Sequence, residues 1–249
     1  MKKEFYGWLI LLIIGMSSCL DTSNDIDTWD GGVTYLFAAQ DGSSLIPGWS
    51  DGAAYYKNED GLEYDFGHER IDEVGGMQLL SNNTTADSIF HYAQRTLSRN
   101  DVSGPGLAPN TKYDFYVQIS WIAMLPDAPD LGYDDVNDWK SAIKLAISDE
   151  RVAVSENEAG VMIPNINPGS FVGAGDDNVV HGKMVIPGTD GQNNNPENKK
   201  YFSQTGATQI QSTTDALGAV NLMVGYLSNV KVKFGMHVTS IAINYKKAN

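Results

Sequence analysis

The residues with the most evident chemical potential are amides and a carboxylate in the stretch LLSNNTTADSIFHYAQR at 79–95. Asn82, Asn83 and Asp87 lie in its polar centre, between an apolar pair and an alternating run. Such groups can hydrogen-bond a ligand, but short polar side chains also close turns on their own backbone. The stretch therefore predicts a loop between two strands, with Asn82, Asn83 and Asp87 as candidate ligand-binding residues and catalysis as the second alternative.

A second set of acids lies in the irregular stretch 125–139. Asp134, Asp135 and Asp138 offer hard oxygen ligands at the variable spacing that calcium accepts. The stretch does not match the twelve-residue calcium loop of helix-loop-helix proteins. Because acidic loops are expected in so acidic a chain, a calcium site and a solvated loop both stay open. The sequence establishes no other cofactor.

Aromatic residues near the irregular stretches could form platforms for sugar rings. Tyr133 and Trp139 lie in the 125–139 stretch, and Asp177 lies in a further acidic loop. An exposed ring beside amides and carboxylates suits glycan binding, whereas aromatic rings also anchor loops on a core. We name Tyr133, Trp139 and Asp177 as candidate ligand-binding residues, with anchoring as the alternative.

The histidines provide no catalytic signature. His181 follows Asp177 by four positions, a spacing that could serve general base catalysis but recurs by chance. His91 and His237 occur within strand patterns and are expected to be structural, whereas His68, in the segment HERID, is expected in a solvated loop. The sequence contains no nucleophile elbow, phosphate-binding loop, dinucleotide-binding glycine motif or two-histidine zinc motif. A hydrolase using paired loop carboxylates stays open, although nothing selects a pair.

Alternation with a period of two dominates the elements that must position these residues. In 113–123, one face would carry Tyr113, Phe115, Val117, Ile119 and Trp121, and the other Asp114, Tyr116, Gln118 and Ser120. In 237–245, one face would carry Thr239, Ile241, Ile243 and Tyr245, and the other Val238, Ser240, Ala242 and Asn244. Each pattern predicts a strand with one buried face.

Shorter patterns complete the set of strands. They are expected at 33–39, 64–66, 77–80, 89–97, 141–148, 179–186, 219–226 and 230–234, separated by connections rich in Gly, Asn and Pro. A helical pattern of ten residues is absent from the sequence. The predicted fold is therefore all-β, an antiparallel two-sheet β-sandwich.

The amino terminus is typical of a secretory signal peptide. Lys2 and Lys3 precede an apolar run that is too short to span a bilayer comfortably, and two serines precede Cys19. An uncleaved membrane anchor is the alternative. The predicted organisation is a signal peptide at 1–18, a flexible polar tether at 19–31 and a single β-sandwich domain at 32–249.

The charge balance excludes one class of partner. The chain carries 17 Lys and Arg residues against 31 Asp and Glu residues, a formal net charge of −14. A surface this acidic repels nucleic acid and anionic lipid. We therefore expect no nucleic-acid partner and no other partner that would bind this protein through phosphate groups.

The segment around Cys19 resembles the lipobox of bacterial lipoproteins, in which that cysteine is lipidated and becomes the new amino terminus. The acidic residues that follow resemble the surface-export signal of Bacteroidetes lipoproteins. Because Cys19 is the only cysteine, its lipidation would leave no thiol for disulfides, thiolate metal sites or redox chemistry. The resemblance implies a protein anchored by lipid at the bacterial outer membrane or cell surface.

The order of several landmarks resembles an uncharacterised family of secreted bacterial lipoproteins over residues 46–245. The landmarks are GWSDGAAYY, LLSNNTTADSIFHYAQRTL, GLAPNTKYDFYVQISW, NINPGSFVGAGDDNVVHG and TTDALGAVNLMVGYLSN. GLAPNTKYDFYVQIS also resembles the strand entry of galactose-binding-like jelly rolls and carbohydrate-binding modules. In it Pro109 and Asn110 favour a turn and Leu107 would plug that turn into the core.

These resemblances imply a jelly-roll fold and no specific activity. The expected function is a lipid-anchored extracytoplasmic binding or structural module, with a glycan or an envelope protein as partner. Two alternatives stay open: a hydrolase that acts on polysaccharide or another envelope polymer, and a structural subunit of a surface assembly.

Overall fold

The computed structural model describes residues 29–37, 46–57, 62–71, 74–83, 86–125, 139–173, 175, 179–184, 186 and 201–249. These residues form strands, turns and irregular segments, and none of them belongs to a helix that could cross a membrane. The strands are β1 (Gly31–Leu36), β2 (Ser50–Ala54), β3 (Glu63–Ile71), β4 (Val74–Asn82), β5 (Ile89–Leu97), β6 (Lys112–Met124), β7 (Ser141–Ser148), β8 (Val154–Glu156), β9 (Met162–Pro164), β10 (Val179–Lys183), β11 (Tyr201–Thr213), β12 (Val220–Ser228) and β13 (Lys233–Lys247).

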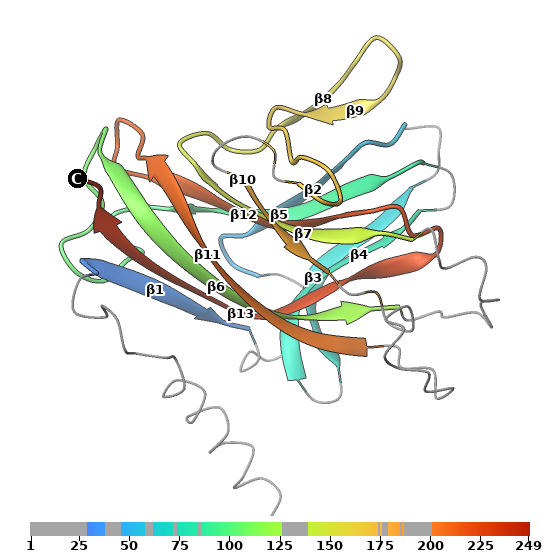
Figure 1. Ribbon diagram of the computed structural model, residues 1–249, viewed down its shortest axis with the longest axis horizontal. Coiled ribbons are helices and arrows are strands. Elements are labelled where there is room, and N and C mark those ends of the chain that lie inside the picture. The colour runs from blue at the N-terminus through green and yellow to red at the C-terminus, as the bar shows by residue number, and fades with distance from the viewer. Residues whose placement is uncertain are drawn as a thin grey trace, which may run out of the picture.

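Two antiparallel sheets pack face to face (Figure 1). The six-stranded sheet has the order β11-β6-β13-β4-β3, with β1 also paired to β13, and the five-stranded sheet has the order β10-β7-β12-β5-β2. Most consecutive strands lie in opposite sheets: the chain changes sheet between β1 and β2, β2 and β3, β4 and β5, β5 and β6, β6 and β7, β10 and β11, β11 and β12, and β12 and β13. This arrangement confirms the predicted all-β, antiparallel two-sheet sandwich of jelly-roll type.

The strongest alternating patterns are confirmed. The strands predicted at 89–97 and 141–148 have the expected bounds, and the strand at 113–123 lies within β6. The inner face of β6 buries its apolar residues as expected: Tyr113, Phe115, Val117, Ile119 and Trp121. The turn before β6 also forms as predicted, because Leu107 is buried and Asn110 adopts a φ of 46°.

The prediction for the faces of 237–245 is wrong at its start. The register of β13 against β6 shifts between Val238 and Ser240, which places an extra residue in the strand. Val238 and Ile241 are consequently both buried, while Thr239 leaves the core and donates a hydrogen bond from Oγ1 to Ser120 O at 3.1 Å. A bulge of this kind reverses the alternation of side chains, so sequence periodicity alone places the residues before it on the wrong face.

The prediction of a solvated loop at HERID is also wrong. His68 belongs to β3, is buried, and its Nε2 donates to Phe37 O at 3.0 Å. Strand β11 was missed because it lacks an apolar alternation. Its thirteen residues are mostly Ser, Thr and Gln, and Ile210 is its one buried apolar residue among those whose side chains are described. β2, β8 and β9 are short strands that no alternation marked.

The five-stranded sheet is buried on both faces. Every residue of β7 and β12 is buried. Residues such as Leu145 face the main core between the sheets, whereas Ala146 and Met223 face a second apolar cluster with Val152 and Phe171. Residues 149–173, which include the β8–β9 hairpin at the top of Figure 1, therefore cover the outer side of this sheet.

Lys144 fastens this covering segment to β7. Its side chain is buried, and Nζ donates to Ser170 O at 2.7 Å and to Gly173 O at 2.9 Å. Burial lowers the pKa of Lys144 to about 8. The two carbonyl groups thus hold a nitrogen that would otherwise be costly to bury.

Substitution of Lys144 by methionine should loosen the covering segment. Met fills a similar volume but leaves the two carbonyls without their donor, so we expect the free energy of unfolding to fall by about 1–3 kcal/mol. Amide hydrogen exchange over 165–173 should accelerate. The exposed neighbour Lys140 gives the matched control, Lys140→Met. Equal stability of the two variants would contradict this account.

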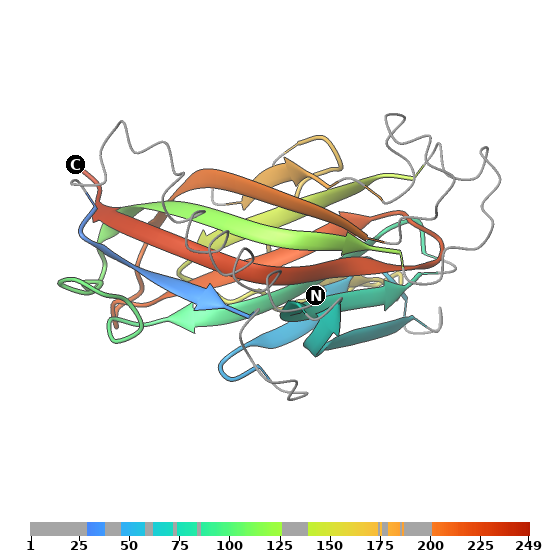
Figure 2. The same cartoon turned by 90° about the horizontal axis from the view of Figure 1, so that it is seen from below.

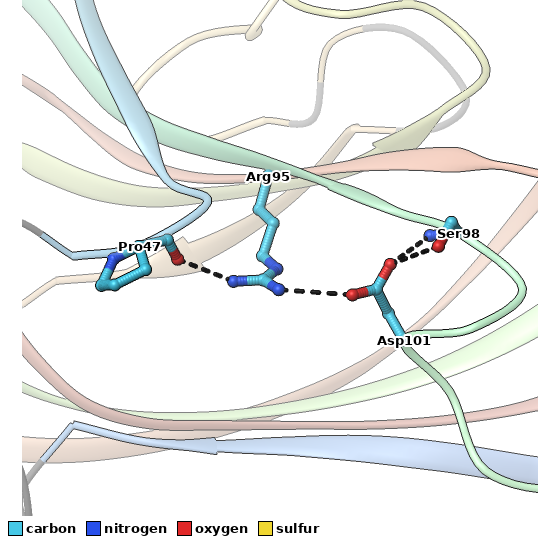
Figure 3. A network of polar contacts seen from close by, with 4 residues as sticks. All are labelled: Pro47, Arg95, Ser98 and Asp101. Atoms are coloured by element: carbon cyan, nitrogen blue, oxygen red, sulfur yellow. Dashed lines mark hydrogen bonds and ion pairs between the residues drawn. The ribbon is translucent and has the colours of Figure 1, made fainter.

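A polar clasp around Arg95 lies near β1 and β5, and Figure 3 shows its contacts with Pro47 and Asp101. Arg95 donates from Nη1 to Pro47 O at 2.8 Å and from Nη2 to Asp101 Oδ1 at 3.3 Å, and its guanidinium lies 4.9 Å from the centre of the Tyr35 ring. Burial would raise the pKa of Asp101, but hydrogen bonds from Ser98 and Arg95 outweigh it and hold that pKa below its usual range. The clasp connects β5 to the segment before β2 and to β1 of the opposite sheet.

Buried histidines make stability depend on pH. His91 is fully buried between Tyr64 and Tyr226, with ring centroids 5.3 and 5.8 Å away, and its Nε2 lies 3.9 Å from Asp51 Oδ2. Burial lowers the pKa of His91 below 6.5, against the opposing effect of Asp51, and burial likewise lowers the pKa of His237. Because the unfolded chain then takes up protons first, acidification favours unfolding.

The free energy of unfolding should therefore fall as the pH drops below 6.5, in addition to any effect of the carboxylates. In His91→Gln this fall should be smaller, since one group with a lowered pKa is gone. Urea unfolding at several pH values between about 7.5 and 5 measures the difference. Identical pH profiles for the variant and the parent would refute the role of His91.

Candidate functional site

The structure places four of the predicted site residues at one end of the sandwich. Asn82 ends β4, and Asn83 and Asp87 belong to the connection from β4 to β5. Trp139 precedes β7. These residues share an end because β5 and β7 both begin opposite the same residue, Ser228 of β12.

Their exposures differ. Asn82 is half-buried and Asp87 is exposed, whereas Asn83 is buried and its carboxamide has no hydrogen-bond partner in the described part of the chain. Trp139 is half-buried and packs on the main core, which is the arrangement of a loop anchor. The four residues thus lie at one end of the fold, where Asn82 and Asp87 are the accessible polar groups among them, and ligand binding by these residues stays a prediction.

The other predicted site residues lie outside the described residues. These are Cys19, Tyr133, Asp134, Asp135, Asp138 and Asp177, together with the side chain of His181. Within the described ranges, no cluster of three or more His, Cys, Asp and Glu residues could hold a metal ion. Calcium binding in the 125–139 stretch stays a prediction.

A second accessible region lies on the outer side of the six-stranded sheet, where β11, β6 and β13 run side by side (Figure 2). Gln209, Tyr116 and Asn244 are directly paired across these three strands and form one row. The next row along the strands is Ala207, Gln118 and Ala242. We call this surface the open face and define it by Trp29, Asp114, Tyr116, Gln118, Gln209, Gln211, Asn244 and Lys246.

Trp29 is fixed on the open face by the backbone that leads into β1. Asp30 N donates to Tyr245 O at 2.8 Å, and Asp30 Oδ2 accepts from Lys247 N at 2.7 Å. The Trp29 ring consequently lies 6.0 Å from the Tyr116 ring at an interplanar angle of 40°, and Lys246 Nζ lies 5.2 Å from its centre. Two aromatic rings thus stand together beside the row of amides.

The polar groups of the open face differ in whether they are already paired. At one margin, Gln211 Nε2 donates to Asp114 Oδ1 at 2.9 Å. In contrast, the side-chain amides of Gln118, Gln209 and Asn244 make no hydrogen bond to other protein groups among the described residues. Gln209 and Asn244 are exposed and Gln118 is half-buried, so their donors and acceptors are available to a ligand.

Sequence reasoning located part of the open face. Tyr116 and Gln118 were placed on the polar side of the 113–123 strand, and Asn244 on the polar side of 237–245. Trp29 was missed because it lies in a polar, acidic segment that indicated a tether, although Gly31 is already paired with Tyr245. Gln209 was missed with β11 itself. The available signal was a tryptophan two residues before GGVTYL, a short strand pattern.

The sequence matches no protein-family model and no curated protein. Solved structures resemble the fold at low identity. One is a carbohydrate-binding module with specific mannan recognition, at 14% identity over 88% of this chain and 98% of that chain, with a TM-score of 0.39. A second is the enzymatically active domain of tailspike protein 4 of bacteriophage CBA120, at 9% identity over 83% of this chain and 21% of that chain, with a TM-score of 0.35.

A third structure is the family 11 carbohydrate-binding module of Clostridium thermocellum in complex with a β-1,3-1,4-mixed-linked tetrasaccharide. Its identity is 12% over 86% of this chain and 95% of that chain, with a TM-score of 0.33. Similarity at this level assigns no ligand to the chain, so any ligand must be argued from the residues of the open face.

Proposed function

We propose that this protein is a glycan-binding module that works outside the cytoplasm and is anchored by lipid at Cys19. Support for glycan binding comes from the open face, where Trp29 and Tyr116 stand 6.0 Å apart beside three unpaired amides. Aromatic rings present flat apolar surfaces to sugar rings, and amides offer both a donor and an acceptor to sugar hydroxyls.

The shape of the surface around the rings favours an extended glycan over a single sugar. Gly32, Ala207 and Ala242 lie in the rows of the open face and carry little or no side chain. A polymer could therefore lie across β11, β6 and β13 without meeting bulky groups. Since the chain has a net charge of −14, a neutral glycan is favoured over an acidic one.

Binding accounts for this surface better than hydrolysis does. Glycoside hydrolysis needs two carboxyl groups that flank the scissile bond. The described carboxylates at the margin of the open face are Asp30 and Asp114, and each already accepts a hydrogen bond, from Lys247 N and from Gln211 Nε2. Asp30 therefore fixes the backbone next to Trp29, and Asp114 links β6 to β11.

The glycan proposal can be tested by affinity electrophoresis against neutral polysaccharides such as mannan, xylan and mixed-linkage glucan. Trp29→Ala and Tyr116→Ala should each weaken binding by roughly tenfold, equivalent to about 1.4 kcal/mol, because each removes one stacking surface. The matched control is Tyr64→Ala, an exposed tyrosine of β3 outside the open face, which should bind normally.

Two outcomes would contradict the proposal. One is a failure of the parent protein to bind any glycan of the panel. The other is loss of binding in the double variant Asn82→Ala, Asp87→Ala with normal binding by Trp29→Ala, which would place the site at the loop end of the sandwich.

Support for the anchor comes from the sequence, where Lys2 and Lys3, an apolar run and two serines precede Cys19. Trp29 follows Cys19 by ten positions, a distance of at most about 35 Å in a fully extended chain. A lipid on Cys19 would therefore keep the amino-terminal edge of the open face close to the membrane surface. The acidic surface is consistent with attachment through lipid rather than through contact with anionic headgroups.

Cys19→Ala tests the anchor directly. In the bacterial host, the variant should lose incorporation of a labelled fatty acid and should appear in the soluble fraction, because no other cysteine can carry the lipid. Cys19→Ser provides a closer match in size and should behave in the same way. Undiminished labelling of either variant would rule out lipidation at this position.

A further inference from the structure

The strand β11 has an edge with unusually little protection. Among the described residues it pairs only with β6. The segment Thr205–Thr213, TGATQIQST, contains no charged residue and no proline. An unpaired edge presents backbone donors and acceptors to other strands, and natural proteins usually block such edges with charges, proline, bulges or a covering segment.

The other edge strands of the two sheets are protected in these ways. β3 carries Glu63 and Asp65 among other charges, β2 carries Asp51, and β10 carries Lys183. β1 is short, with six residues, and Ser103 occupies the start of its edge: its backbone N donates to Gly32 O at 2.8 Å and its Oγ accepts from Gly32 N at 3.0 Å. The long neutral edge of β11 is therefore an exception within this fold.

An apolar cavity of about 60 Å³ lies beside the same edge, between the two sheets. Its lining includes Ile119 and Trp121 of β6, Ile143 and Leu145 of β7, Gly182 of β10 and Gly206 of β11. A Cβ atom on Gly206 would lie only 3.3 Å from the Trp121 ring, so the glycine helps to leave this space open. Trp121 Nε1 is buried and has no hydrogen-bond partner in the described structure.

We propose that the Thr205–Thr213 edge of β11 binds an extended segment of a partner protein as an added strand, with one small side chain of that segment in the cavity. In strand addition, main-chain hydrogen bonds supply affinity and side-chain pockets supply specificity. Both features meet here, because the cavity lies at Gly206 and Thr208, within the neutral edge.

The cavity defines which side chain it accepts. A cavity of roughly 150 Å³ holds benzene, so one of about 60 Å³ leaves room for a small branched side chain. Valine fits the apolar lining. Threonine fits it too and would bring a hydroxyl oxygen that can accept from Trp121 Nε1, the donor without a partner.

A partner protein fits this edge better than a second copy of the chain. A second copy would have to offer a side chain of its own β11 to the cavity. Ile210, the buried apolar side chain of that strand among those described, already packs in its own core, where it is 3% exposed. Two chains with a net charge of −14 each also repel one another. A neutral or basic segment avoids both obstacles, so the expected partner is an extended, uncharged or basic stretch with Val or Thr at one fixed position.

The test begins with peptides of about twelve residues, displayed on phage, in which alternate positions are limited to Thr, Val and Ser. Selection on the purified full chain should enrich peptides with Val or Thr at one shared position. Binding of a selected peptide, measured by fluorescence polarisation, should weaken at least about tenfold in the double variant Thr205→Lys, Ala207→Lys, because charge blocks pairing at the edge. Binding of the selected peptide to the parent chain should also slow the hydrogen exchange of the β11 backbone amides.

A second variant probes the cavity without altering the edge. Gly206→Ala fills part of the space against Trp121 and should weaken the same peptide while the thermal unfolding of the chain stays cooperative. The matched control is Leu217→Lys, which changes an exposed residue at the tip of the β11–β12 turn and should leave binding intact.

Three results would overturn the proposal. One is the absence of enriched peptides, and another is equal binding of the peptides to the parent and to the lysine variant. The third is a dimer in sedimentation that the lysine variant dissolves, since that result would assign the edge to a second copy of the chain.

Discussion

Burial of the five-stranded sheet on both faces is the constraint that shapes the rest of this molecule. Residues 149–173 lie across its outer side, and the ammonium group of Lys144 holds them there through Ser170 O and Gly173 O. A sheet covered on both sides has no face left for a ligand, so the accessible sheet surface belongs to the six-stranded sheet. The same constraint explains why apolar or small residues occupy most positions of SAIKLAIS and VNLMVGYLS instead of alternating with polar ones: both faces of these strands are buried.

The two long sides of the sandwich are closed by different means. Near β1 and β5, the Arg95 guanidinium bridges the sheets by contacting the Tyr35 ring and Pro47 O. Near β10 and β11, the facing strands instead contribute Gly182 and Gly206, and a cavity remains beside Trp121. The Arg95 contacts therefore close one long side of the sandwich. On the other side, the glycines leave a cavity next to the β11 backbone edge, where we propose that a partner strand binds.

The sequence predicted those elements whose structure follows from local alternation. The face assignments of Tyr113 to Trp121 in β6 are confirmed because that strand is regular and one of its faces meets water. Local alternation cannot reveal an inserted residue, so the bulge at Thr239 reversed the faces before it. It also cannot reveal a strand such as β11, which pairs with β6 along its backbone and, among the side chains that the structure describes, buries one apolar residue, Ile210. The candidate site was predictable to the same extent: Tyr116 and Gln118 were recognised as outward-facing, but their alignment with Gln209 and Asn244 depends on the register of three strands that are distant in sequence.

Strand β11 belongs both to the open face and to the edge proposed to bind a partner, so the two surfaces are geometrically coupled. Side chains of β11 such as Gln209 point to the open face, whereas its backbone forms the edge. A strand added to β11 would continue the row that runs through Gln209, Tyr116 and Asn244, because paired residues in adjacent strands place their side chains on the same face. A partner bound at the edge would therefore widen the surface proposed to bind a glycan, while Trp29 closes that surface at the opposite side, beside β1. The register of β11 against β6 thus determines both which amides line up on the open face, where a glycan is proposed to bind, and where a partner's side chains would extend the row.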